Sequence, residues 1–267
     1  MSKKVEIYIL THKKFNESFD NSIYFPLLNG SYSHNDDFGY IRDDTGNNIS
    51  KLNDYFAELT GEYWVWKNSD ADIVGFCHYR RWFVKNLKYE KITEKDILND
   101  LNEYDIILPQ KTRLSGSIRQ ITEESLKNNP DYGVKLEDYE KLTQVIKNYF
   151  PEYYESYKKH INGNYSYNNN MFICYKNLAD SYFEWAFDVI DKLKGEIDFS
   201  KYSENNKRVF GFVSEHLLSV FVLKHRLRIK EYYVYLNERK FPFIHFLNRR
   251  FPMIQRLESG VYSFLNK

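Results

Sequence analysis

The sequence has few of the features that mark secreted or membrane-spanning proteins. Cysteine occurs twice in 267 residues, at Cys77 and Cys174. Each lies inside an apolar run, so we expect a reducing compartment rather than a disulfide framework. No apolar run reaches the roughly 18 residues of a transmembrane helix. The first ten residues also lack the apolar stretch and cleavage site of a signal peptide. These absences predict a cytoplasmic protein.

The motifs of several enzyme classes are also missing. The sequence contains no Walker-type glycine loop, no GxGxxG fingerprint and no GxSxG elbow, and its two cysteines and seven histidines show no zinc-binding spacing. The formal net charge is +1, so no nucleic-acid partner is expected. Aromatic residues, in contrast, make up 18% of the chain. Tyrosine suits cores, sugar platforms and wet interfaces alike, and an AT-rich genome would enrich it without any functional reason.

The order of apolar and amphipathic segments predicts a single α/β domain. Buried strands are predicted at residues 5–10, 73–77, 105–109, 171–175 and 229–235. Helices are predicted from an N-cap at Ser50 to about residue 68, from a capping box at Thr93 to about residue 102, over much of 123–160, and at 178–193 and 212–224. Because strands alternate with helices, we expect residues 1–238 to form one Rossmann-like domain, with a mixed, mostly parallel central sheet flanked by helices.

The strongest local signal is the run His78-Tyr79-Arg80-Arg81, which directly follows a predicted buried strand. In open α/β sheets, ligands bind outside the carboxyl ends of strands, and two guanidinium groups there can hold a diphosphate. His78 could contact a phosphate, bind a metal or transfer a proton. The alternative is a pair of ion-paired surface arginines beside a hydrogen-bonded core histidine.

Asp70-Ala71-Asp72 resembles the Asp-x-Asp motif that binds a metal and a diphosphate in many glycosyltransferases. That motif normally follows a hydrophobic strand, whereas this pair precedes one. We therefore interpret it as a solvated turn at the opposite edge of the sheet.

Three further segments carry polar groups that suit sugar or nucleotide recognition. They are the acidic loop at residues 42–48, the asparagine run at residues 168–170 and Glu215, which lies near the start of a predicted helix. Glu215 could bind an acceptor or act as its general base. Each segment has a structural alternative: a turn that closes on itself, a loop that satisfies its own backbone, and a carboxylate stabilised by the helix dipole.

The C-terminal residues 239–267 form a basic and aromatic extension. Five basic residues alternate with bulky apolar ones: Arg239, Lys240, Arg249, Arg250 and Arg256. This composition is typical of interfacial membrane segments, so we expect peripheral contact with the cytoplasmic membrane. The alternative is that the extension packs on the domain or on a second subunit of a homodimer.

Several of these stretches together resemble the DUF4422 family of capsular and exopolysaccharide glycosyltransferases. The matching segments are residues 11–13, 26–30, 43–50, 58–60, 63–68, 75–81, 170–172 and 211–215. The resemblance runs from about residue 3 to 235, and the block from Asp43 to Arg81 is its specific part.

The resemblance implies a GT-A-like fold and transfer of a sugar from a nucleotide sugar to a growing glycan. UDP-galactose and UDP-galactofuranose are the leading donors that it implies, and a divalent metal, Mn²⁺ or Mg²⁺, is left open. The catalytic candidates are Glu215, Asp44 and His78, and His78 is also the candidate metal ligand. The candidates for binding the donor are Thr11, His12, Lys13, Asp43, Asn48, Lys67, His78, Tyr79, Arg80, Arg81, Asn169 and Asn170.

We interpret the chain as a glycosyltransferase that acts by direct displacement, in the service of surface polysaccharide synthesis. Its partners would be the nucleotide sugar and a glycan or lipid-linked acceptor. The alternative function is that of a non-catalytic carbohydrate-binding or scaffold protein of a polysaccharide assembly complex.

Overall fold

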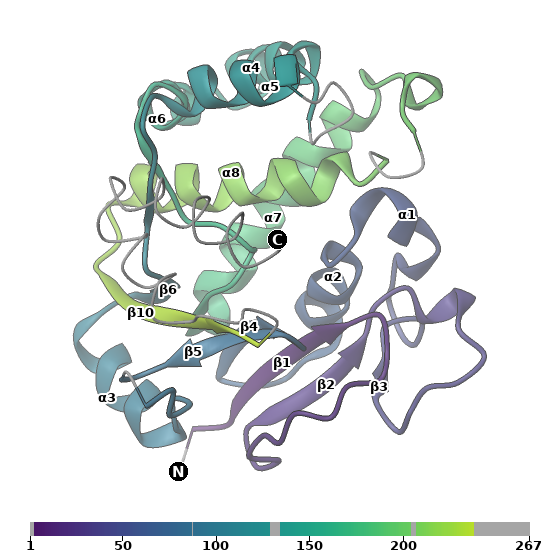
Figure 1. Cartoon of the computed structure of the whole chain (residues 1–267), viewed down its shortest axis with the longest axis vertical. Coiled ribbons are helices and arrows are strands. Elements are labelled where there is room, and N and C mark those ends of the chain that lie inside the picture. The colour runs from purple at the N-terminus through teal and green to yellow at the C-terminus, as the bar shows by residue number, and fades with distance from the viewer. Residues whose placement is uncertain (1–2, 87, 129–133, 204–206, 238–267) are drawn as a thin grey trace, which may run out of the picture.

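The computed structural model describes residues 3–86, 88–128, 134–203 and 207–237, and these form a central sheet covered by helices (Figure 1). The sheet has the strand order β3-β2-β1-β4-β5-β10-β6-β9, and β9 also pairs with β4. Its strands are β1 (Val5–Thr11), β2 (Tyr24–Leu28), β3 (Ile41–Arg42), β4 (Ile73–His78), β5 (Arg81–Val84), β6 (Ile106–Pro109), β9 (Ile173–Tyr175) and β10 (Ile229–Leu236). A small separate ribbon pairs β7 (Thr112–Arg113) with β8 (Tyr165–Ser166).

The sheet is mixed, as predicted. Four of its pairings are parallel, namely β1–β2, β1–β4, β2–β3 and β6–β10. Another four are antiparallel, namely β5–β10, β4–β5, β4–β9 and β6–β9. The prediction of a mostly parallel sheet is therefore not confirmed for the described residues. The parallel half from β3 to β4 is the part that brings several carboxyl strand ends to one edge.

Helices cover both faces of the sheet (Figure 1). They are α1 (Asn53–Phe56), α2 (Leu59–Asn68), α3 (Glu94–Glu103), α4 (Ile118–Asn128), α5 (Leu136–Tyr149), α6 (Pro151–Ile161), α7 (Lys176–Lys194) and α8 (Val209–His225). Alternate side chains of β1 point to opposite faces, so Tyr8 and Leu10 join one core while Ile7 and Ile9 join the other. The first core contains α2, α7 and α8, and the second contains α3.

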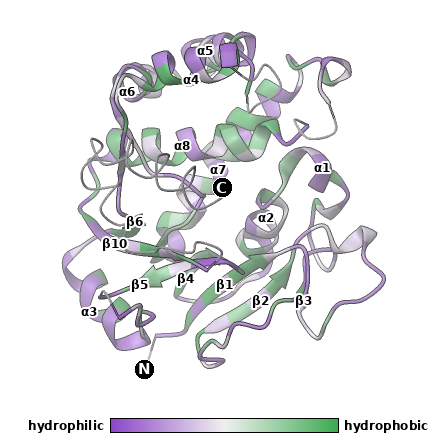
Figure 2. Ribbon diagram, in the orientation of Figure 1, coloured by the Kyte–Doolittle hydropathy of each residue, from purple (hydrophilic) through white to green (hydrophobic). Residues whose placement is uncertain are grey.

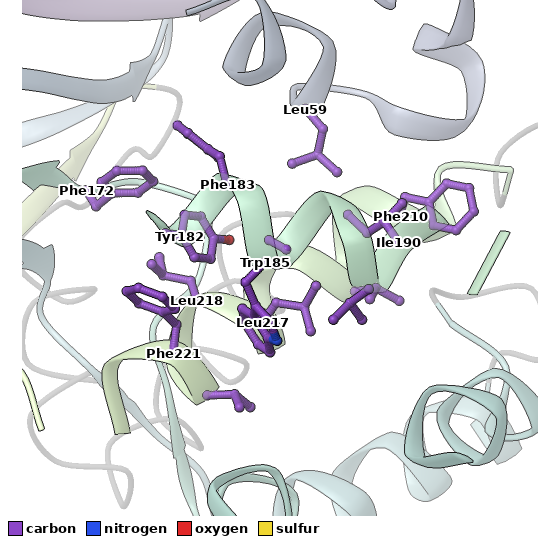
Figure 3. Close-up of a cluster of buried hydrophobic side chains, with 14 of the residues drawn as sticks. Leu59, Phe172, Tyr182, Phe183, Trp185, Ile190, Phe210, Leu217, Leu218 and Phe221 are labelled. Atoms are coloured by element: carbon purple, nitrogen blue, oxygen red, sulfur yellow. The ribbon is translucent and has the colours of Figure 1, made fainter. Parts of the chain in front are cut away.

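The larger core lies between the sheet and the helices α2, α7 and α8, and it extends between α7 and α8. Figure 3 shows aromatic side chains of both helices, with Phe172 beside them and Leu59 of α2 approaching from the sheet side. Trp185 and Phe221 have ring centroids 6.0 Å apart, and Tyr182 and Phe221 5.4 Å apart. The hydropathy colouring follows this layering, because α8 is mostly hydrophobic whereas the outer helices α3 to α6 show polar stretches (Figure 2). Helix α8 is thus held in the core along most of its length.

Two local predictions are corrected by the structure. The helix predicted to run unbroken from Ser50 to residue 68 is divided, because Ala57 adopts φ 49° between α1 and α2. Ser50 does not cap a helix. It begins a short 3₁₀ turn, and its hydroxyl donates instead to Asp43 over 2.6 Å. The predicted capping box, in contrast, is confirmed at the start of α3, where Thr93 and Asp96 exchange hydrogen bonds.

The C-terminal extension predicted at residues 239–267 lies outside the described residues. Among the described helices, none combines the length and apolar character needed to cross a membrane.

Candidate functional site

A cavity of about 470 Å³ opens at the carboxyl edge of the parallel strands. It is lined by Leu10, Thr11, His12, Asn29, Asn53, Asp54, Ala57, Glu58, His78, Tyr79, Arg80, Arg81, Asn169, Arg208, Gly211, Phe212 and Glu215. The register explains this convergence: Leu10 pairs with His78 across β1 and β4, and Thr11 pairs with Leu28 across β1 and β2. The ends of three adjacent parallel strands therefore face the first turns of α8 across one hollow.

The run His78-Tyr79-Arg80-Arg81 forms the hairpin that joins β4 to β5. His78 and Arg81 are paired across the two strands, and Tyr79 and Arg80 form the turn. All four residues line the cavity. Arg81 also begins β5, a strand that the sequence analysis did not predict.

The His78 ring is held by the loop that precedes β9. Its Nε2 atom lies 2.7 Å from the carbonyl oxygen of Asn169, and because a carbonyl only accepts, Nε2 carries the hydrogen. Burial lowers the pKa of His78, against the raising effect of the Glu58 charge. A neutral ring in this tautomer leaves Nδ1 as a hydrogen-bond acceptor.

The loop at Asn169 and Asn170 has a strained backbone. Both residues adopt positive φ angles, 75° and 49°, which is uncommon outside glycine. The strain positions polar groups in three directions. Besides the contact to His78, the Asn169 N–H donates to Glu215 Oε1 over 2.8 Å, and Asn170 Nδ2 donates to Glu58 Oε1 over 2.8 Å. Strained residues at a cavity that also orient titratable groups are characteristic of functional sites.

Three carboxylates line the cavity: Asp54 of α1, Glu58 at the N-cap of α2 and Glu215 of α8. Burial, followed by the charge of Glu58, raises the pKa of Glu215 to about 7, against the opposing effects of the Asn169 N–H and Arg81. A carboxylate with this pKa can accept a proton near neutral pH. The geometry therefore fits the predicted role of Glu215 as a base.

Cationic groups occupy the remaining wall. Arg80, Arg81 and Arg208 line the cavity with His12, and Arg208 is the residue immediately before α8. The ring of Tyr79 contacts His12 and Arg80, with centroid distances of 5.4 and 5.7 Å. Burial, then the charges of Lys13 and Arg80, lowers the pKa of His12. Three guanidinium groups and the N-terminal end of a long helix suit a polyanionic ligand.

The structure places several sequence-predicted residues away from the cavity lining. Asp43 is fully buried and accepts hydrogen bonds from the backbone of Gly30 and Ser31 and from the hydroxyls of Ser31 and Ser50. Asp44 forms an ion pair with Arg42 over 2.8 Å. Asp43 therefore organises the loop after β2, and Asp44, paired with Arg42, is not among the residues that line the cavity.

Four other candidates also lie outside the lining. Asn48 donates to the carbonyl of Gly46 within its own turn, and Lys67 lies over the Trp66 ring at 3.1 Å. Lys13 lies 5.1 Å from the centre of the Tyr79 ring, near the cavity but not among its lining residues. Asn170 is 1% exposed, and its side-chain amide donates to Glu58, which does line the cavity. Asn48 thus has the self-closing role that was the alternative interpretation of the acidic loop.

Several lining residues were not singled out by the sequence: Asn29, Asn53, Asp54, Glu58, Arg208 and Phe212. Asn29 directly follows β2, so recognition of that strand would have identified it. Glu58 lies in the family-matching segment at residues 58–60 but was not predicted as a site residue, and no local pattern marks Arg208; both reach the cavity only through the packing of α1, α2 and α8.

The described residues contain no group of three or more His, Cys, Asp or Glu side chains placed to hold a metal ion. His78 offers a single ring nitrogen. Asp70 pairs with Lys4, and Asp72 accepts from the Lys4 N–H over 2.8 Å, at the start of β4 and thus at the edge of the sheet opposite the cavity.

The fold and site define a mixed α/β protein whose polar, arginine-lined cavity lies at the carboxyl ends of parallel strands. Residues 6–226 match the model of the family described as "Domain of unknown function (DUF4422)", so the chain belongs to this family. No curated protein matches the chain. The apo structure of the bifunctional glycosyltransferase WbbM is similar, with 30% sequence identity and a TM-score of 0.76. The match covers 88% of this chain and 46% of that one, so this chain spans about half the length of WbbM.

Proposed function

We propose that the chain is a glycosyltransferase with a GT-A-like fold that transfers a sugar, galactose or galactofuranose, from a UDP-sugar. The acceptor would be a growing surface polysaccharide or a lipid-linked glycan, at the cytoplasmic face of the membrane. The observation that carries this proposal is one cavity that combines three arginines with three carboxylates, Asp54, Glu58 and Glu215. The similarity to a bifunctional glycosyltransferase over most of the chain supports it.

The polar groups of the cavity suggest how a nucleotide sugar lies in it. We assign the diphosphate to Arg80, Arg81 and Arg208, because guanidinium groups bind phosphates through paired hydrogen bonds. We assign the nucleoside to the end formed by Thr11 and Asn29. The sugar then reaches the group His78, Asn169 and Glu215.

Transfer in this arrangement is a direct displacement. The acceptor hydroxyl oxygen bonds to the anomeric carbon while the bond from that carbon to the phosphate oxygen breaks. The hydroxyl proton passes to Glu215, which is a competent acceptor with its raised pKa of about 7. The nucleoside diphosphate leaves with the extra negative charge, and the arginines stabilise it.

The proposal is tested by incubating the purified chain with UDP-galactose, UDP-galactofuranose, UDP-glucose and UDP-N-acetylglucosamine. Release of UDP and a rise in melting temperature with one donor support the enzyme. The same reactions with Mn²⁺ and with EDTA test the metal, and we expect equal rates in both. Absence of turnover and of any thermal shift with every donor would overturn the proposal and favour a non-catalytic scaffold protein.

A further inference from the structure

Glu58 is held by the strained junction between α1 and α2. The preceding residue, Ala57, has φ 49° and ψ −126°, a conformation that is costly for a residue with a Cβ. The carbonyl oxygen of Ala57 accepts from Asn53 Nδ2 over 2.8 Å and from the Thr60 hydroxyl over 3.2 Å. These bonds fix the junction and orient Glu58 toward the cavity.

A structural role in helix capping does not explain Glu58. It occupies the N-cap position of α2, yet its side chain makes no capping hydrogen bond. Instead, Oε1 accepts from Asn170 Nδ2 over 2.8 Å. The same Asn170 amide donates to the Gly211 carbonyl over 3.1 Å, so it links α2, the loop before β9 and α8. The Glu58 carboxylate is therefore oriented by the same strained loop that orients His78 and Glu215.

The charge of Glu58 acts on three titratable neighbours. It is the second cause, after burial, of the raised pKa of Glu215. It also contributes to the raised pKa of Glu62, which lies one turn further along α2. It also opposes the lowering of the His78 pKa by burial. The other charged groups that act on Glu215 and His78 are Arg81 and, for His78, Arg80. Glu58 is thus the acidic residue whose charge acts on all three of these neighbours.

We propose that Glu58 is a second functional carboxylate of the site, which binds hydroxyl groups of the transferred or accepting sugar and whose charge assists Glu215 as proton acceptor. The inference rests on the proposed function. A carboxylate accepts hydrogen bonds from two hydroxyls at once, and such charge-assisted bonds are stronger than neutral ones. Asn170 is a positioning residue, since it reaches the sugar only through Glu58.

The test is the variant Glu58→Gln, which keeps the shape of the side chain and removes its charge. We expect kcat/KM with the best UDP-sugar and its acceptor to fall about tenfold to a hundredfold, the usual loss for a charge-assisted contact. We also expect the acid limb of the pH profile to move to lower pH by about one unit, since a nearby negative charge no longer raises the pKa of Glu215. The shift of that limb reports the charge of Glu58 near Glu215, and the fall in kcat/KM reports its contact with the sugar. A merely structural role for Glu58 would leave kcat/KM unchanged on the pH plateau in a variant that still folds.

Glu62→Gln is the matched control, on the same helix and with the same chemical change. Both Glu62 carboxyl oxygens are buried without a hydrogen-bond partner among the described residues, and burial, followed by the charge of Glu58, raises the pKa of this group well above its usual range. Glu62 is not among the residues that line the cavity and does not contribute to the raised pKa of Glu215, so the acid limb of this control should coincide with that of the wild type. Melting temperatures of both variants separate loss of folding from loss of function.

A second measurement requires no turnover. Carboxyl carbon NMR of the glutamate-labelled protein follows the titration of Glu215 in the wild type and in Glu58→Gln. A lower titration midpoint in the variant supports the inference, and an unmoved midpoint or an unchanged kcat/KM overturns it, even in an active enzyme. A wild-type protein that is inert toward every donor instead overturns the proposed function, so the two failures are distinguishable.

Discussion

The backbone of Asn169 and the carboxylate of Glu215 are joined by a 2.8 Å hydrogen bond that links the loop before β9 to the second turn of α8. The carbonyl of the same residue holds His78 at 2.7 Å. One peptide segment in a left-handed conformation therefore sets the positions of two titratable groups that come from different elements. The relative orientation of His78 and Glu215 is therefore set by a single residue, Asn169.

Removal of the Arg80 guanidinium should abolish transfer while leaving the fold intact. Arg80 lies in the turn between β4 and β5 and lines the cavity, where it would stabilise the leaving diphosphate. We expect Arg80→Ala to lower kcat by about a hundredfold or more, as for other transition-state charge contacts. The exposed Arg119 on α4 offers the matched control, since Arg119→Ala makes the same change away from the cavity. Unchanged turnover of Arg80→Ala, measured as UDP release, would remove Arg80 from the mechanism.

Arg208 should contribute mainly to donor affinity. It is exposed at the start of α8, lines the cavity and has its guanidinium 5.9 Å from the centre of the Phe212 ring. We expect Arg208→Ala to raise the KM for the UDP-sugar about tenfold with a smaller change in kcat, and Arg208→Lys to recover part of the loss. Because the contact is exposed, the effect should shrink as salt increases. Equal donor affinity in Arg208→Ala, measured by calorimetry, would contradict this assignment.

Glu215→Gln should lose activity and gain stability at alkaline pH. The pKa of Glu215 is raised from 4.5 to about 7, so the folded protein binds its proton more tightly than the unfolded chain does. This contribution to stability is fully present below about pH 4.5 and is lost as the pH rises to about 7, at a cost of about 3 kcal/mol. The variant avoids that cost. Its melting temperature should therefore exceed that of the wild type at pH 8 but not at pH 4.5.

Wild-type activity should show the same titration. If Glu215 accepts the proton of the acceptor hydroxyl, kcat/KM rises with pH through about 7. A pH profile without an inflection near this value would argue against Glu215 as the base, even if Glu215→Gln is inactive.

Much of the fold follows from local patterns. The strands β1, β4, β6, β9 and β10 and the helices α3, α7 and α8 lie close to their predicted ranges, because their apolar periodicity matches their burial. Strand β2 was missed since it is short and contains Pro26, and β5 was missed since it begins within the charged run that ends at Arg81. The division between α1 and α2 follows from a single left-handed residue, Ala57, which has no sequence signature.

The site was predictable to the extent that it lies along one strand. His78 to Arg81 follow an apolar run, so their position at a strand end was clear from the sequence. Glu58 and Arg208 belong to the same cavity only because α1, α2 and α8 pack against the sheet edge, and such tertiary proximity leaves no local pattern. Asp43 is the converse case. The sequence suggested it as a binding residue, whereas in the structure its carboxylate accepts hydrogen bonds from within its own loop region.

Asn29 and Gly61 provide a test of the assigned nucleoside end. Asn29 is 6% exposed, lines the cavity, and its Oδ1 is buried without a hydrogen-bond partner in the described structure. A Cβ on Gly61, inside α2, would lie 2.3 Å from that oxygen and 3.0 Å from Leu10 Cδ2. An interior helical glycine costs about 1 kcal/mol relative to alanine, and here it makes room for the Asn29 amide.

We therefore expect both Asn29→Ala and Gly61→Ala to weaken UDP binding about tenfold, the first by removing the amide and the second by displacing it. Gly61→Ala should also lower the melting temperature, whereas Gly195→Ala at the end of α7, where a Cβ meets only the Lys192 carbonyl at 3.5 Å, should not. In the double variant the smaller residue 29 relieves the clash with its amide, so the melting temperature should recover while UDP binding stays weak. Recovery of both properties together would show that Asn29 does not contact the nucleotide.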